Sequence, residues 1–123
     1  MRRRLSPEEV YPALDTRVRA RFISVQGLRT RIVEAGPADG MPVVCVPGWA
    51  SSAFQFRKNL PALAEAGFRA IAVDLPGQGE SEKPTDPTFY TIRALTNHLQ
   101  AVLESYRTSG RSASRSLPDQ AGR

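Results

Sequence analysis

The stretch from residue 42 to residue 84 constrains the fold of this chain more than any other, because short apolar runs alternate there with glycine-rich loops. Val43–Val46 is a β-branched run interrupted only by Cys45. Unbroken apolarity over so few residues is typical of a strand that is covered on both faces, as the strands of parallel sheets are. We therefore expect a buried strand that ends at Pro47 and Gly48.

A helix and a second strand are expected next. Apolar residues recur at helical spacing across residues 54–66, with Pro61 near the first turn, and Gly67 is placed to cap the C-terminus. Arg69–Val73 returns to a strand pattern, and residues 74–81 (DLPGQGES) form a turn rich in residues that permit positive φ. The order predicts a βαβ unit with parallel strands and a right-handed crossover.

Further elements flank this unit. Phe22–Val25 and Leu28–Glu34 partly alternate around Gln26-Gly27, which predicts an antiparallel hairpin. A second helix is expected over residues 91–104, with an apolar face formed by Ile92, Leu95, Leu99, Val102 and Leu103. The predicted fold class is α/β.

Two loops that follow the predicted central strands resemble signatures of the α/β-hydrolase family. The first, residues 46–49 (VPGW), resembles a loop usually written HG followed by a large residue, with Pro47 in place of the His. The second, from Asp74 to Ser81, matches D-x-x-G-x-G-x-S at every defined position. The resemblance extends over residues 22–104. It implies an incomplete α/β-hydrolase sheet made of the hairpin, the βαβ unit and the following helix.

The resemblance also implies roles for residues in both loops. The backbone N–H of Trp49 would be one donor of the oxyanion hole, and Gly48 would let the chain turn that N–H toward a substrate oxygen without a Cβ clash. The alternative is that the loop only ends a strand and that Trp49 is a core or pocket-wall aromatic. In the second loop, the residues implied to shape the turn are Asp74, Gly77, Gly79 and Ser81.

The catalytic residues of the family are absent from these 123 residues. Members of the family carry a nucleophile in G-x-S-x-G, followed along the chain by an acid and a His. No G-x-S-x-G occurs here, and the single histidine, His98, precedes any place where a nucleophile could lie. We therefore expect no catalytic nucleophile, acid or base, and we expect His98 to be a structural residue on the surface or edge of its helix.

The predicted organisation has three parts: a basic N-terminal arm over residues 1–20, the N-terminal part of an α/β-hydrolase core over 21–104, and a disordered Arg/Ser-rich tail over 105–123. The tail has one large apolar residue, Leu117, which is too few for a buried strand. The family pattern is expected to break off near Ser105, and one hypothesis is that the tail is an aberrant ending to a once longer chain. The break would leave the Val43–Val46 strand with an open edge, and an open apolar edge favours self-association or aggregation.

Charge and cysteine content argue against several classes of function. The net charge of +5 comes from the two ends, because residues 1–31 hold eight arginines and residues 105–123 hold four. Neither end has interleaved aromatics, so solvated termini are favoured over nucleic-acid or membrane binding. Cys45 is the only cysteine, which favours an inert core thiol. Residues 77–79 lack the third glycine of a dinucleotide fingerprint. No cofactor and no metal are expected.

Two functional hypotheses follow. In the first, the chain represents a hydrolase that acts on a small ester, epoxide, halide or similar substrate by covalent catalysis, with the nucleophile (Ser, Asp or Cys) left open. In the second, which we favour for these 123 residues alone, the chain is a non-catalytic remnant or a weak association module with basic arms. The start, MRRRLSPEEVYPALD, has no apolar h-region, so a cytoplasmic location is expected.

Overall fold

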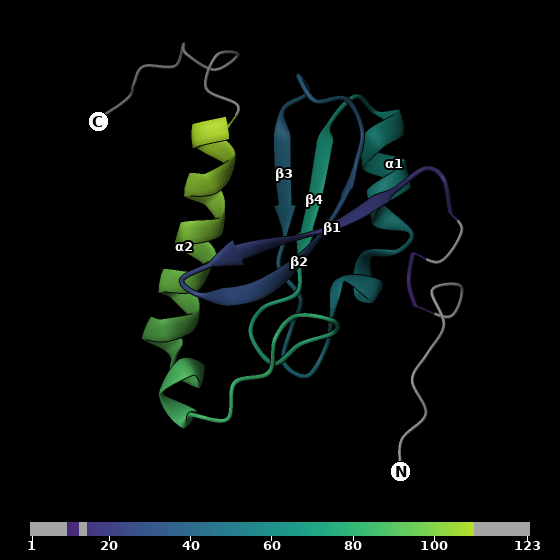
Figure 1. Cartoon of the computed structure of the whole chain (residues 1–123). Helices are drawn as coiled ribbons and strands as arrows, with labels where there is room; N and C mark the ends of the chain where they lie inside the picture. The colour runs from purple at the N-terminus through teal and green to yellow at the C-terminus, as the bar shows by residue number, and fades with distance from the viewer. Residues whose placement is uncertain (1–9, 13–14, 110–123) are drawn as a thin grey trace.

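The structure is a computed structural model that describes residues 10–12 and 15–109. Four strands form one sheet in the order β1-β2-β4-β3, in which β1–β2 and β2–β4 are antiparallel and β3–β4 is parallel (Figure 1). The elements along the chain are β1 (Arg19–Val25), β2 (Leu28–Ala35), β3 (Pro42–Cys45), the 3₁₀ helix η1 (Ala53–Phe56), α1 (Asn59–Glu65), β4 (Arg69–Val73), the 3₁₀ helix η2 (Pro87–Tyr90) and α2 (Ile92–Ser109).

The sheet is covered on both faces, with α1 on one side and α2 on the other (Figure 1). Because side chains alternate along a strand, neighbouring residues enter different cores. In β2, Ile32 packs on the α2 side and Val33 on the α1 side, and both are fully buried. Cys45 is half-buried where it packs against the α1-side core, and burial raises the pKa of its thiol. This three-layer arrangement confirms the predicted α/β fold class.

The hairpin is present and begins earlier than predicted. β1 starts at Arg19, where it pairs with Glu34, and its turn has positive φ at both Gln26 (53°) and Gly27 (79°). Two such residues are what a tight two-residue hairpin of type I′ requires. The last residues of the predicted basic arm are therefore ordered, and Val18 lies in the core. Residues 1–9 and 13–14 of that arm lie outside the described residues.

The single helix predicted over residues 54–66 is two shorter elements, η1 and α1. Pro61 explains the break, since it has no N–H to donate to Arg57 C=O and so must lie in the first turn of a helix. The predicted cap is confirmed. Gly67 has φ 93° and donates to Ala64 C=O at 3.0 Å, while Phe68 N–H donates to Leu63 C=O at 3.0 Å, a Schellman pattern.

The prediction of a buried strand over Val43–Val46 is wrong in both the bounds and the burial of the strand. β3 covers Pro42–Cys45 and lies at one edge of the sheet, so its central residues are only half-buried and Val46 is 42% exposed. Within the described part of the chain, β4 is its only neighbour in the sheet. The parallel pairing of β3 with β4 is as predicted.

The second helix continues to Ser109, past its predicted end at residue 104. Tyr106 supplies the reason, because its hydroxyl donates to the carboxylate of Glu34 on β2 and its ring lies under the guanidinium groups of Arg21 (5.4 Å) and Arg69 (4.9 Å). Burial raises the pKa of the Glu34 carboxyl, but hydrogen bonds from Tyr106 and Arg21 outweigh it and leave that pKa lowered. Residues 110–123 of the predicted tail lie outside the described residues.

Candidate functional site

The two signature loops lie side by side, because β3 and β4 are parallel neighbours and their carboxyl ends meet at one edge of the sheet. We call residues 46–52 the β3 loop and residues 74–81 the β4 loop. Two hydrogen bonds connect this region: Gln78 Nε2 donates to Gly48 C=O at 3.1 Å, and the Ala53 N–H donates to Asp74 Oδ1 at 2.7 Å. This edge is the usual place for a binding site in an open α/β sheet.

Asp74 holds the β4 loop together from within the protein. Its side chain is fully buried and pairs with Arg31 Nε at 3.0 Å, an arginine that is itself 4% exposed. The same carboxylate accepts the N–H groups of Ala53 and Glu80. Ser81 completes the network, since its hydroxyl accepts the Arg31 N–H at 2.7 Å and donates to Asp74 C=O at 2.5 Å. These hydrogen bonds satisfy the charge of Asp74 internally, so its carboxylate does not face a ligand.

The two glycines of the β4 loop make room for other side chains. A Cβ on Gly79, where φ is 49°, would lie 2.3 Å from Asp74 Oδ2. A Cβ on Gly77, where φ is 84°, would lie 2.7 Å from the ring of Tyr90. Both glycines are therefore required by positive φ and by close approach. The defined positions of the D-x-x-G-x-G-x-S pattern build a rigid turn.

The β3 loop is organised differently. Gly48 is held on both sides, since its N–H donates to Gln55 Oε1 at 3.1 Å and its C=O accepts from Ser51 N–H and Gln78 Nε2, both at 3.1 Å. Ala50 has a φ of 59°, as the third residue of a type II turn requires. Trp49 is 92% exposed, so it is not a core aromatic of the described residues, while a place in a pocket wall stays a prediction.

The backbone N–H of Trp49 has no acceptor among the described residues. An unpaired amide on a braced loop at the carboxyl end of a parallel strand is chemically available to an anionic or developing negative oxygen. Gly48 itself is less constrained than expected, because a Cβ there would meet no atom within 4 Å. The need for a glycine at this position stays a prediction that concerns the substrate.

His98 was predicted to lie on the surface or edge of its helix, and this prediction is wrong. The residue is 1% exposed and lies between α2 and β2. Its Nε2 lies 2.9 Å from Thr30 Oγ1, and that hydroxyl also donates to Leu28 C=O. Its Nδ1 is buried without a partner among the described residues, and burial lowers the pKa of the imidazole. Spacing could have indicated this, since His98 is three residues after Leu95 and four before Val102, on the helix's apolar face.

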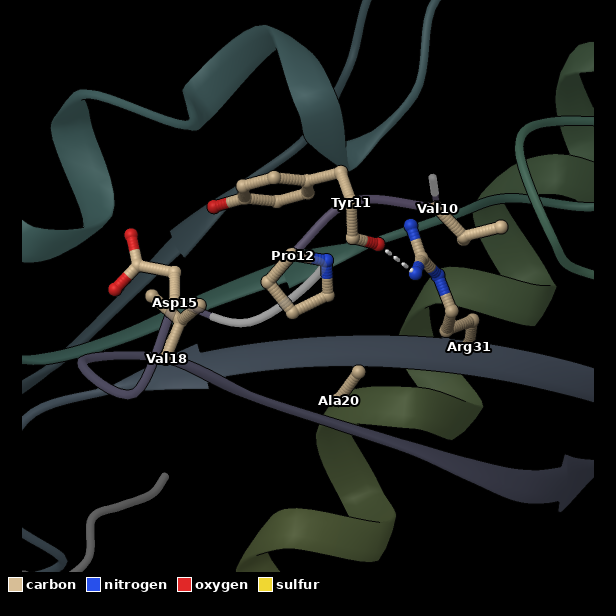
Figure 2. Close-up of a pocket in the computed structure, with 7 residues that line it drawn as sticks. All are labelled: Val10, Tyr11, Pro12, Asp15, Val18, Ala20 and Arg31. Carbon is tan, nitrogen blue, oxygen red and sulfur yellow. Dashed lines mark hydrogen bonds between the residues drawn. The ribbon is translucent and has the colours of Figure 1, made fainter. Parts of the chain in front are cut away.

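A separate open pocket of about 340 Å³ lies beside the N-terminal segment (Figure 2). Arg31 contributes one wall, with Nη1 donating to Tyr11 C=O while Nε remains on Asp74. No residue of the β3 loop lines it, so this pocket is distinct from the candidate site. Its lining residues are Val10, Tyr11, Pro12, Asp15, Val18, Ala20 and Arg31.

The described residues contain neither a metal-binding cluster nor a helix that could span a membrane. No three His, Cys, Asp or Glu side chains gather there as metal ligands would. No helix in that part of the chain combines the length and apolarity needed to cross a bilayer.

Comparison with known proteins identifies the family. The model of the alpha/beta hydrolase fold matches residues 41–108, more than half of the chain and including both loops. The chain belongs to the α/β-hydrolase fold family. The match ends at residue 108, close to the end of α2, so the family pattern extends past the predicted break near Ser105.

Individual relatives within the α/β-hydrolase family agree. A haloalkane dehalogenase of Psychrobacter cryohalolentis is 43% identical over 77 residues, which is 63% of this chain and 25% of that protein. Epoxide hydrolase A of Mycobacterium tuberculosis is 36% identical over 84 residues, 68% of this chain and 26% of that protein. The crystal structure of an epoxide hydrolase from Vigna radiata matches with a TM-score of 0.70 and 30% identity, covering 74% of this chain and 29% of that one. The chain thus spans about a quarter of the length of these two curated relatives.

Sequence reasoning placed the two loops but missed the side chains that connect them. Gln78 occupies an undefined position of the D-x-x-G-x-G-x-S pattern, and Gln55 and Arg31 lie outside both signatures. A polar residue with both a donor and an acceptor between the two glycines was the available signal for Gln78.

Proposed function

We propose that this chain is the part of an α/β-hydrolase that supplies one amide of the oxyanion hole, the backbone N–H of Trp49. The observation that carries the proposal is that this N–H is unpaired among the described residues while the preceding residue, Gly48, is held through both its N–H and its C=O. Preorganised amide donors stabilise the negative charge that develops on the carbonyl oxygen of an ester, whether the ester is the substrate or is formed on a carboxylate nucleophile, and they do so without reorganising during the reaction.

We propose a small neutral electrophile as the substrate class of the whole enzyme, with an epoxide or a haloalkane first. The relatives named as epoxide hydrolases and haloalkane dehalogenases support this choice. An ester stays possible, because the nucleophile that would distinguish these reactions is not contained in the 123 residues.

We also propose that these residues alone do not catalyse hydrolysis. The position of His98 favours this view, since the only histidine of the chain is buried against Thr30 and cannot reach the β3 loop as a general base. The full chain should show no turnover of p-nitrophenyl esters, styrene oxide or 1-bromobutane above the buffer rate, and no labelling by a fluorophosphonate probe. A covalent adduct on this polypeptide, detected by mass spectrometry, would contradict the proposal.

The oxyanion role is tested in a chimera in which residues 19–108 of this chain replace the corresponding segment of epoxide hydrolase A from M. tuberculosis. Trp49→Pro removes the N–H and should lower kcat by about 10²-fold or more. Trp49→Ala is the matched control, because it keeps the N–H and removes only an exposed side chain. It should stay within about fivefold of the parent chimera, because a change of about 1 kcal/mol is a factor of about five.

Circular dichroism of both variants shows whether the fold is retained. Equal kcat values for folded Trp49→Pro and Trp49→Ala would exclude the amide from the reaction. A large loss in both would assign the effect to the indole side chain instead.

A further inference from the structure

We propose that Gln78 is a positioning residue that orients the Trp49 N–H by holding the carbonyl on the other side of the same peptide bond. This inference rests on the proposed function. It adds a positioning side chain from the β4 loop to a site whose proposed donor comes from the β3 loop.

The Gln78 side chain is fixed at both ends. Its Oε1 accepts the N–H of Leu75 at 3.0 Å, which leaves Nε2 as the donor to Gly48 C=O at 3.1 Å. Its own backbone N–H donates to Leu75 C=O at 2.8 Å, so the loop that carries it is closed as well. A side-chain amide with both groups engaged has one orientation, and it presents its N–H₂ to the β3 loop.

The carbonyl that Gln78 holds belongs to the peptide unit between Gly48 and Trp49. This bond is trans, so its C=O and N–H point in opposite directions within one plane. Fixing the C=O toward Gln78 therefore fixes the Trp49 N–H away from the β4 loop. A hydrogen bond to the C=O also polarises the peptide and strengthens its N–H as a donor, by about 10–30% per bond.

Ser51 and Gln55 also form hydrogen bonds with Gly48, and they differ from Gln78 in what they hold. Ser51 N–H also donates to Gly48 C=O, so the turn itself supplies a first constraint and Gln78 a second one from a different strand. Gln55 acts on the preceding peptide, because it accepts the N–H of Gly48. Gln55 is thus a matched control: it touches the same glycine without touching the Gly48–Trp49 peptide.

The first experiment uses the full 123-residue chain labelled with ¹³C and ¹⁵N. Gln78→Met removes both hydrogen bonds with little change in volume, while Gln78→Glu keeps an acceptor for Leu75 N–H and removes only the donor to Gly48. Both variants should shift the ¹³C′ signal of Gly48 and the amide signal of Trp49. Gln55→Leu should shift the amide signal of Gly48 and leave that of Trp49 nearly unchanged.

The second experiment measures kinetics in the epoxide hydrolase chimera described above. Gln78→Met and Gln78→Glu should lower kcat by about three- to tenfold with KM nearly unchanged. The reason is that a misoriented Trp49 N–H loses about 1 kcal/mol of stabilisation in the transition state, where charge develops, and not in the bound substrate. Gln55→Leu should lower kcat less than either Gln78 variant, because Gln55 holds the preceding peptide and not the Gly48–Trp49 peptide. Gln78→Asn should also have a lower kcat than the parent chimera, because its side chain is shorter.

These outcomes separate the two proposals. If Trp49→Pro lowers kcat and folded Gln78 variants leave both kcat and the Trp49 amide signal unchanged, the oxyanion role stands and the positioning role is excluded. If Trp49→Pro has no effect, the proposed function itself fails, whatever the Gln78 variants do. Should Gln78→Met not fold, Gln78→Glu gives the same comparison with the Leu75 hydrogen bond retained.

Discussion

The β4 loop and the β3 loop sit at the same edge of the sheet, yet they use their polar groups in opposite ways. In the β4 loop, a buried carboxylate and a hydroxyl form hydrogen bonds within the protein, and two glycines leave room for neighbouring side chains. In the β3 loop, Gly48 is held through its N–H and its C=O, whereas the Trp49 side chain is exposed and the Trp49 N–H has no acceptor in the part of the chain that the structure describes. The loop that matches the family pattern best is thus the scaffold, and the loop that departs from it carries the available donor.

In these two loops, agreement with the family motif marks residues that are needed for internal contacts, and not residues that are free to bind a ligand. Asp74, Gly79 and Ser81 are constrained because each satisfies or clears space for another buried group. A loop that must leave a donor free for a ligand has fewer internal contacts to preserve, so its sequence can vary more.

The largest expected effect separates the two loops by stability. Asp74→Asn leaves the buried guanidinium of Arg31 without its counter-charge, which should lower the free energy of unfolding by about 3–5 kcal/mol. Urea unfolding of the full chain, followed by circular dichroism, measures this loss. Asp39→Asn is the control, because Asp39 is exposed and should change stability by less than about 0.5 kcal/mol. A loss below about 1 kcal/mol in Asp74→Asn, on the scale of a single ordinary hydrogen bond, would remove the distinction between the loops.

A smaller effect compares one glycine from each loop. Gly79→Ala forces a Cβ into the Asp74 carboxylate at a positive φ, and should cost about 2–4 kcal/mol in unfolding free energy. Gly48→Ala meets no atom within 4 Å and should cost less than about 1 kcal/mol. Thermal melts of the two variants give the ranking. Equal losses would mean that the β3 loop is as tightly packed as the β4 loop.

The smallest expected effect sets the pH at which these comparisons are cleanest. Burial lowers the pKa of His98 in the folded state, so the unfolded state takes up the proton first as the pH falls below the ordinary value of 6.5. Stability should be fully present above that value and decline below it, by about 1 kcal/mol for each unit of pKa difference.

Charged groups near β2 are engaged elsewhere and do not bond to His98. Arg29 stacks on Phe22 at 3.5 Å, Arg31 pairs with Asp74, and Glu82 accepts the Arg29 N–H. His98→Leu should therefore flatten the slope of unfolding free energy against pH between 7 and 5. An unchanged slope in that variant would assign the acid sensitivity to another group, and the loop variants would then need comparison at several pH values.

Much of the architecture followed from local pattern. The hairpin turn at Gln26-Gly27, the strand Arg69–Val73 and the cap at Gly67 were all predictable, because each depends on backbone preferences that a few neighbouring residues determine. Pro61 also carried the information that would have shortened the first helix, since a missing N–H acts within one turn.

Other features depended on contacts between residues far apart in the chain. The hydrogen bond of His98 needed Thr30, 68 residues away, and the extension of α2 needed Glu34 to meet Tyr106. The half-buried state of β3 followed from its place at the end of the strand order.

The amino-acid sequence by itself determined the α/β class, the two loops and the family, because strand and turn signals are short-range and survive without knowledge of neighbours. Only the tertiary structure decided which loop is scaffold and which offers a donor. That assignment depends on where Arg31, Ala53 and Gln78 place their hydrogen bonds, and those partners come together only when the sheet brings β2, β3 and β4 side by side.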